Sequence, residues 1–180
     1  MNSLERTSPA LPRFEPLGDH HDRAAFSCEQ LSLTRFLTER ALRDMRARLS
    51  ATHVLLMDSD VEIAGCYTLA AASIPLARIS DSDRKRLKLS KYPQMSAVLI
   101  ARLARDERWR GRGTGDLLMI DALRRLEAQT AHVGAAFVIV DAIDEHAAQF
   151  YESFGFLRFP DTPRQLFLPM TTVQRALGTR

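Results

Sequence analysis

Three glycines and two arginines alternate in one short segment of the 180-residue chain. The segment Arg110-Gly111-Arg112-Gly113-Thr114-Gly115 follows an apolar run and precedes a stretch with helical periodicity. A turn of this kind presents unpaired backbone N–H groups and the positive end of a helix dipole. Glycine lets a phosphate approach the backbone without a Cβ in the way, and the arginines add positive charge. The sequence therefore predicts an anion site here; the alternative is a turn that only connects two elements.

The spacing of the glycines excludes two common phosphate-binding motifs. Walker A requires a lysine followed by serine or threonine after its second glycine, and no such pair follows Gly115. The Rossmann fingerprint requires a third glycine three residues after the second, whereas Gly111, Gly113 and Gly115 are spaced two and two. The turn is therefore not expected to bind a P-loop nucleotide or a typical dinucleotide.

The elements around the turn predict a parallel pair of strands. Residues 97–103 and 135–140 are continuous apolar runs of the kind found in buried strands. Between them, residues 116–129 carry an apolar stripe at helical spacing. Strand, helix and strand form one βαβ unit, which indicates an α/β fold with parallel strands.

The remaining pattern predicts one domain over residues 14–170, preceded by a flexible arm over residues 1–13 and followed by a tail over residues 171–180. The other expected elements are a helix over residues 27–49, a hairpin of residues 53–57 and 61–69, a basic loop or short helix over residues 84–91, a helix over residues 144–154 with Asp144 as N-cap and Gly155 as left-handed end, and a strand over residues 166–168.

The composition is typical of a globular protein and excludes several other classes. The chain is 46% hydrophobic and 26% charged, with 25 Lys+Arg against 22 Asp+Glu. It contains no apolar run long enough to span a membrane, and no secretory signal is expected at its N-terminus. The two cysteines, Cys28 and Cys66, form no metal spacing and suit reduced thiols in the cytoplasm.

Two motifs in a fixed order carry a family resemblance. The segment 110–115 resembles Gln/Arg-x-x-Gly-x-Gly/Ala, the acyl-CoA pyrophosphate loop of the GNAT N-acetyltransferases. The downstream segment 147–156, AAQFYESFGF, resembles the second half of that family's signature, A-x-x-F-Y-x-x-x-G-F. Within the family, roughly residues 14–170 are similar to the toxins of bacterial type II toxin–antitoxin pairs, which acetylate aminoacyl-tRNA.

The resemblance implies a GNAT fold, a mixed twisted sheet with a splayed parallel strand pair flanked by helices. It also implies direct acetyl transfer from acetyl-CoA to an amine, without an acyl-enzyme. The positions that it assigns to acetyl-CoA are the backbone of Leu103, Ala104 and Arg105, the loop Arg110, Gly111, Arg112, Gly113, Thr114 and Gly115, and Asp144. A backbone N–H near Leu103 would polarise the thioester carbonyl. Asp144 has a second interpretation, as a plain N-cap.

Tyr151 occupies the family's general-acid position, from which its hydroxyl would protonate the departing thiolate. Its spacing also supports an ordinary structural role. Ala147, Phe150, Tyr151 and Phe154 follow i, i+3, i+4, i+7, the pattern of a helix that faces a core. From spacing alone, Tyr151 is a core residue; the catalytic role rests on the resemblance.

No histidine stands out as a general base, and the sequence predicts no metal site. An α-amine needs less help than a lysine, because its pKa is ~7.7–8 against ~10.4. An aminoacyl ester lowers it further by induction. The missing base therefore favours an α-amine substrate.

Two basic groups lie outside the turn. The first consists of Arg35, Arg43 and Arg46, which share one face of a helical wheel drawn at ~100° per residue. The second consists of Arg84, Lys85, Arg86 and Lys88, with Lys91 beyond them. Such clusters suit a phosphate backbone, here tRNA. The alternative is a pair of solvated surfaces.

The preferred hypothesis is therefore an acetyl-CoA-dependent toxin acting on aminoacyl-tRNA. By resemblance, a ribbon–helix–helix antitoxin and a homodimer are expected. The alternatives are an N-acetyltransferase for a small-molecule or protein amine, and a non-catalytic acyl-CoA-binding regulator.

Overall fold

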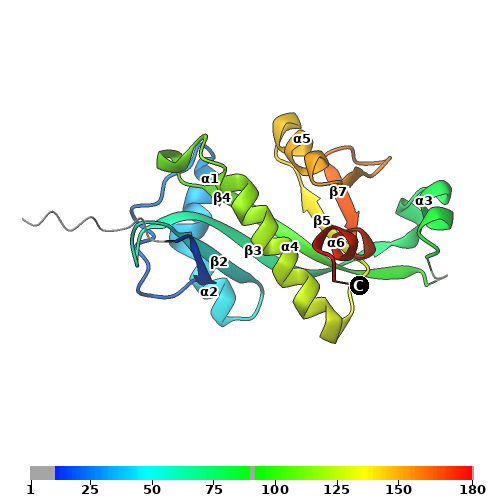
Figure 1. The fold of residues 1–180 in the computed structure, drawn as a ribbon, viewed down its shortest axis with the longest axis horizontal. Coiled ribbons are helices and arrows are strands. Elements are labelled where there is room, and N and C mark those ends of the chain that lie inside the picture. Colours follow the sequence, from blue (N-terminus) through cyan, green and yellow to red (C-terminus); the bar gives the residue numbers. More distant parts are fainter. Residues whose placement is uncertain (1–10, 90–91, 180) are drawn as a thin grey trace, which may run out of the picture. The chain divides into compact units, whose positions relative to one another are not determined.

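The computed structural model describes residues 11–89 and 92–179. The strands are β1 (Arg13–Pro16), β2 (Ala51–Leu56), β3 (Ile63–Pro75), β4 (Gln94–Arg105), β5 (Phe137–Asp141), β6 (Leu157–Arg158) and β7 (Gln165–Pro169) (Figure 1). The α-helices are α1 (Leu31–Arg35), α2 (Ala41–Arg46), α3 (Asp81–Arg86), α4 (Thr114–Val133), α5 (Glu145–Ser153) and α6 (Met170–Leu177). A π-helical turn, η1 (Phe36–Arg40), joins α1 to α2, and two 3₁₀ turns are η2 (Leu76–Arg78) and η3 (Glu107–Trp109).

The seven strands form one mixed sheet in the order β1-β2-β3-β4-β5-β7-β6. Strands β4 and β5 run parallel, with Val98 opposite Val138, and are connected through α4. The pairs β1–β2, β5–β7 and β6–β7 are antiparallel. The predicted βαβ unit and the mixed α/β class are thus confirmed.

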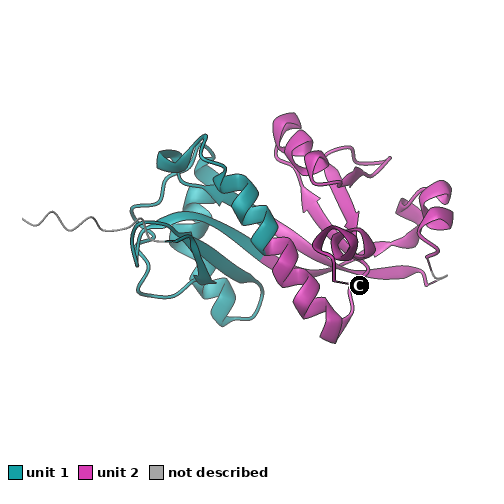
Figure 2. Cartoon of the chain, in the orientation of Figure 1, with its two compact units in different colours: residues 1–68, 102–121 teal, residues 69–101, 122–180 magenta. Residues whose placement is uncertain are grey.

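The chain divides into two compact units (Figure 2). Unit 1 consists of residues 1–68 and 102–121, and unit 2 of residues 69–101 and 122–180. Strands β3 and β4 and helix α4 each contribute residues to both units. In unit 1, Phe36, Leu37 and Leu42 pack with buried residues of β2 and β3. In unit 2, Phe159 and Phe137 contact the ring of Phe167 at centroid distances of 4.8 and 5.7 Å.

The segment predicted as one helix over residues 27–49 is interrupted by the π turn. Its buried apolar pairs, Phe36-Leu37 and Ala41-Leu42, are five residues apart. A spacing of five matches the i→i+5 repeat of a π-helix and places both pairs on the core side. A wheel drawn at ~100° per residue therefore does not apply across residues 36–40, and it gives no relation between Arg35 and Arg43.

The other predicted elements are present, with different ends. Helix α4 begins at Thr114 rather than Asp116, and β3 continues to Pro75. Gly155 follows α5 in the left-handed conformation, at φ +88°, as expected. Strand β1 and helix α6 form where no element is predicted; the buried Met170 and Val173 anchor α6.

The ends of the domain, at residues 14 and 170, stay a prediction. Of the predicted arm, residues 1–10 lie outside the described part of the chain, as does Lys91. No helix in the described part combines the length and apolarity that a membrane span needs.

Candidate active site

The glycine-rich turn in unit 1 has a backbone conformation that residues other than glycine rarely adopt. Gly111 and Gly113 both lie at φ +71°, and a Cβ added at either would meet no atom within 4 Å. The approach to the turn is therefore open. Thr114 is buried and donates its hydroxyl to the carbonyl of Trp109 at 3.1 Å, which closes the turn onto the first residue of α4.

Helix α4 supplies the amide groups that an anion at this turn would use. Its first backbone hydrogen bond runs from the N–H of Leu117 to the carbonyl of Gly113. The N–H groups of Thr114, Gly115 and Asp116 belong to the first helical turn, where the helix itself offers no acceptor. The helix continues for 20 residues, so its dipole is fully developed. These features suit an anion, and the pyrophosphate site predicted for segment 110–115 stays a prediction.

Both arginines of the turn contact other side chains. Arg110 forms an ion pair with Glu29, with Nη1 2.5 Å from Oε1. The guanidinium of Arg112 lies 5.0 Å from the centre of the Trp109 ring, within cation–π range. Both arginines are exposed. An incoming phosphate would therefore compete with Glu29 for Arg110, and it would find Arg112 already held against the Trp109 ring.

The end of β4 forms one wall of a pocket of about 130 Å³ in unit 1. The lining residues are Cys28, Glu29, Gln30, Leu33, Leu103, Ala104 and Arg105. Three of them are the positions whose backbone is predicted to pair with the acetyl and pantetheine amides. Arg105 also lies 3.8 Å from the Glu29 carboxylate. The pocket therefore brings a carboxylate, Glu29, to the predicted acetyl-binding strand.

Asp106 connects the two segments of the chain that line this pocket. It is only 1% exposed and accepts hydrogen bonds from the backbone N–H of Ser27 and from the backbone and side chain of Arg108. Burial raises the pKa of Asp106, but the hydrogen bonds from Arg108 and Ser27 outweigh it and hold the pKa below its usual value. An ionised Asp106 thereby ties the loop before α1 to the end of β4.

Tyr151 lies on α5 in unit 2 and is 7% exposed. Its ring contacts those of Phe150 and Phe156 at centroid distances of 5.5 and 5.7 Å. Burial, with a smaller contribution from Asp141, raises the pKa of the hydroxyl to about 12. The hydroxyl therefore stays protonated at neutral pH. Tyr151 is a packed core residue, as its spacing predicted, and it also carries a proton that it could donate.

Asp144 caps α5. Its Oδ1 accepts a hydrogen bond from the N–H of Ala147 at 2.7 Å, and its backbone is extended. The N-cap interpretation is confirmed. The predicted contact between Asp144 and pantetheine stays a prediction.

The predicted basic groups differ in how far acidic neighbours compensate them. Arg46 binds both oxygens of Asp19, at 2.6 and 2.8 Å, and Arg43 lies 3.6 Å from Asp44. Arg35 has no ion-pair partner within the described residues.

On α3, the arginines pair with acids of the preceding turn. Arg84 bonds to Asp81, and Arg86 bonds to Asp83 at 2.6 Å. The hydrogen bond from Arg86 lowers the pKa of Asp83. Lys85 and Lys88 have no ion-pair partner within residues 11–89 and 92–179. The available charge of this group is therefore smaller than its sequence suggests.

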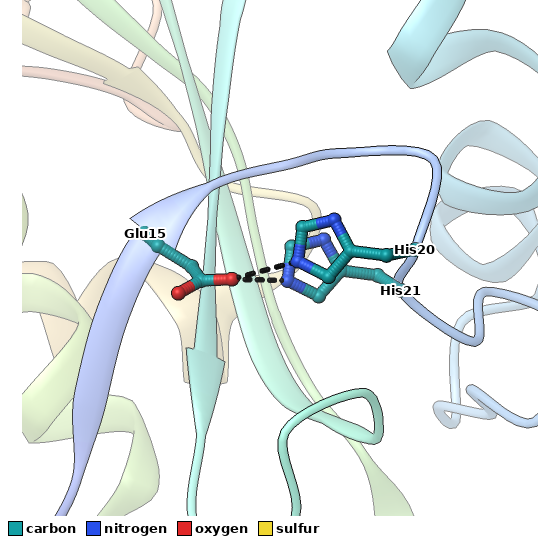
Figure 3. Close-up of side chains that lie close together, drawn as sticks. All are labelled: Glu15, His20 and His21. Atoms are coloured by element: carbon teal, nitrogen blue, oxygen red, sulfur yellow. Dashed lines mark hydrogen bonds and ion pairs between the residues drawn. The ribbon is translucent and has the colours of Figure 1, made fainter.

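Glu15, His20 and His21 form a cluster in unit 1 that the sequence pattern does not reveal. Figure 3 shows both imidazoles pointing at the Glu15 carboxylate, whose Oε1 lies 3.0 and 2.8 Å from their Nε2 atoms. His21 also accepts the N–H of Gly18 at Nδ1, 2.9 Å away, so a neutral His21 carries its proton on Nε2. That nitrogen donates to Glu15 and has no lone pair for a metal. Hydrogen bonds from His20 and His21 lower the pKa of Glu15 and fasten β1 to the following loop.

Residues 50–158 match the acetyltransferase (GNAT) domain family. The chain belongs to the GNAT acetyltransferase family. It is accordingly an acetyl-CoA-dependent N-acetyltransferase, as its two motifs predicted.

Two relatives are similar over most of their length. The chain is 29% identical over 184 residues to the probable toxin TacT of Sinorhizobium fredii, covering 97% of this chain and 100% of the relative. It is 29% identical over 162 residues to a tRNA-acetylating toxin of Mycobacterium tuberculosis, covering 90% and 94%.

Two solved structures show the same fold. The toxin AtaT complexed with acetyl-methionyl-tRNAfMet matches with a TM-score of 0.84 and 26% identity, over 92% of this chain and 99% of that chain. A mutant AtaT bound to the C-terminus of the antitoxin AtaR matches with a TM-score of 0.79 and 25% identity, over 94% and 99%.

Proposed function

We propose that this protein is a toxin that transfers the acetyl group of acetyl-CoA to the α-amine of an aminoacyl-tRNA and thereby blocks translation. The observation that carries the proposal is the match over nearly the whole chain to AtaT in its complex with acetyl-methionyl-tRNAfMet. The tRNA-acetylating relative of Mycobacterium tuberculosis supports the same substrate class.

In the proposed reaction, unit 1 holds acetyl-CoA. The open turn at Gly111 and Gly113 and the first N–H groups of α4 bind the pyrophosphate. The backbone at Leu103, Ala104 and Arg105 pairs with the acetyl and pantetheine amides, and an N–H there polarises the thioester carbonyl. Alignment of thioester and amine supplies much of the rate.

The reaction needs two proton transfers, one from the amine and one to the departing thiolate. The α-amine has a pKa of ~7.7–8 or lower, so a free-base fraction is present at neutral pH, and water takes the proton that the nitrogen releases after it attacks. The amine attacks the thioester carbon, the C–S bond breaks, and the thiolate of CoA leaves. Tyr151, a phenol that is protonated at neutral pH, donates the proton that the thiolate takes and is reprotonated from water. The product is an acetylated aminoacyl-tRNA.

We further propose two tRNA-binding surfaces, partners and a location. The surfaces are Arg35, Arg43 and Arg46, and Arg84, Lys85, Arg86 and Lys88. The expected partners are an antitoxin of the ribbon–helix–helix type and a second copy of the chain; the AtaT–AtaR complex supports an antitoxin. Charged tRNA is cytoplasmic, which places the activity there.

Labelled acetyl-CoA incubated with a pool of charged tRNA tests the proposal directly. Label should appear on the aminoacyl end of one or a few tRNAs, and deacylated tRNA should stay unlabelled. Label on a small-molecule or protein amine instead would identify an acetyltransferase of another substrate class. Acetyl-CoA binding without transfer to any amine would indicate a regulator and would overturn the proposal.

A further inference from the structure

Arg102 occupies an unusual place next to the predicted acetyl-binding backbone. It lies on β4 directly before Leu103, is only partly exposed, and stacks on the buried ring of Phe36 with its Cζ 3.7 Å from the ring centre. Stacking at this distance holds the planar guanidinium in one orientation. Its N–H donors are thereby arranged before any ligand arrives.

The π turn carries a second arginine, Arg40, whose charge acts on Arg102. Arg40 is the last residue of the turn, is exposed, and lies four residues after Phe36. Burial lowers the pKa of Arg102, and the positive charge of Arg40 lowers it further, against a smaller opposing effect of Asp44. Because Phe36, on which Arg102 lies, and Arg40 belong to the same five-residue turn, two like charges sit near each other beside the end of β4.

Neither arginine has an acidic partner at ion-pair distance among the residues that the structure describes. Two other arginines of unit 1 do have acidic partners: Arg13 pairs with Glu15 and Asp60, and Arg108 with Glu62 and Asp106. A like charge close to the partly buried Arg102 is unfavourable, and an anion bound between the two arginines relieves it. The geometry thus points to an anionic ligand.

We propose that Arg40 and Arg102 bind a backbone phosphate near the aminoacyl end of the tRNA substrate. The proposal rests on the proposed function and names where the acceptor is held. The pyrophosphate of acetyl-CoA is already assigned to the turn at residues 110–115. A phosphodiester close to the reacting amine must lie near the acetyl-binding residues, and Arg102 directly precedes them on β4.

The salt dependence of tRNA binding tests this assignment. Unfractionated bacterial tRNA is titrated against the wild type, Arg40→Gln, Arg102→Gln and the double variant between about 0.05 and 0.2 M salt. Each single change should weaken binding about tenfold and reduce the slope of log K against log salt by about one, with about two for the double variant. Arg102→Lys, which keeps the charge, should retain the slope.

Arg13→Gln is the matched control, because it removes an arginine of the same unit that two acids already compensate. Its slope should equal that of the wild type. Acetyl-CoA binding, measured by calorimetry, should be unchanged in every variant and reports that each is folded. Arg40 is exposed, so Arg40→Gln tests the site even if Arg102→Gln unfolds.

Wild-type slopes in both Arg40→Gln and Arg102→Gln would overturn the assignment while leaving the proposed function intact. Absence of tRNA binding by the wild type at low salt would overturn both. Reduced acetyl-CoA binding in the two variants, with tRNA binding unchanged, would show that the arginines serve the other substrate.

Discussion

Unit 1 and unit 2 present their functional groups in opposite ways. In unit 1, the turn at residues 110–115 is mostly exposed, and its arginines form an ion pair with Glu29 and a cation–π contact with Trp109. In unit 2, Tyr151 is buried among aromatic rings. An exposed cationic turn can release its partners and water when a phosphate binds, whereas a buried hydroxyl is kept in one protonation state. The roles proposed for the two units, cofactor binding in unit 1 and proton donation in unit 2, follow this difference.

The comparison makes a kinetic prediction: changes in unit 1 should alter KM for acetyl-CoA, and changes at Tyr151 should alter kcat. The largest effect is expected for Tyr151→Phe, which removes the proton donor and keeps the ring. kcat should fall by about 10²–10⁴-fold with acetyl-CoA binding unchanged, as measured by steady-state acetyl transfer and calorimetry. Phe156→Leu is the control, because it disturbs the same packing without touching the hydroxyl. Equal turnover in Tyr151→Phe would remove Tyr151 as the acid.

The second prediction concerns the turn. Gly113→Ala places a Cβ at a residue with φ +71°, on the open side where a pyrophosphate would approach. KM for acetyl-CoA should rise about tenfold while kcat changes little, because the Cβ stands where the pyrophosphate would approach; the backbone strain, about 1–2 kcal/mol, should lower thermal stability.

Gly134→Ala is a close match for this experiment. Gly134 lies at φ +69°, and a Cβ there would likewise meet no atom within 4 Å, but no phosphate is assigned to it. It should lower thermal stability to a similar extent and leave KM unchanged. A similar rise in KM in both variants would show that strain, and not the phosphate, accounts for the effect.

The third prediction concerns pH. A tyrosine with an ordinary pKa of 10 would be half ionised at pH 10 and the rate would fall twofold. Because the pKa of Tyr151 is about 12, kcat should stay level between pH 8 and pH 10. The folded-state pKa lies above the unfolded value, so the stability that Tyr151 contributes is complete below pH 10 and is lost as pH rises towards 12. A decline in kcat centred near pH 10, with the protein still folded by circular dichroism, would contradict the role of burial.

The smallest effect is expected at Asp144. Asp144→Asn keeps a side-chain oxygen for the Ala147 N–H, so stability and kcat should change less than twofold. Asp144→Ala should cost about 1 kcal/mol in the free energy of unfolding, measured in urea. A higher KM for acetyl-CoA in Asp144→Ala than in Asp144→Asn at equal folded fraction would assign Asp144 to pantetheine as well as to the cap.

The sequence pattern was sufficient where local periodicity determines structure. The βαβ unit around the turn and the N-cap of α5 follow from apolar spacing, glycine and Asp144. The π turn does not, because a helical wheel assumes a constant angle per residue and the five-residue spacing of Phe36 and Ala41 contradicts it only once the core is known.

The sequence pattern did not predict contacts between residues that are distant along the chain. Glu29 becomes a candidate site residue only because it meets Arg105 and Arg110, which belong to a different part of the chain. The compensation of Arg46 by Asp19 is equally invisible in a charge count. Tyr151 could be interpreted in two ways because a helix facing a core and a helix presenting an acid carry the same apolar stripe.

Unit 1 is built from two separate segments of the chain, and this determines when it can fold during synthesis. The unit joins the N-terminal residues, up to Thr68, with the segment Arg102–Asp121, which supplies the end of β4 and the start of α4. A growing chain therefore cannot complete unit 1 until Asp121 has left the ribosome, and Tyr151 follows later still. An enzyme proposed to stop translation thus acquires its parts for binding before its part for proton donation.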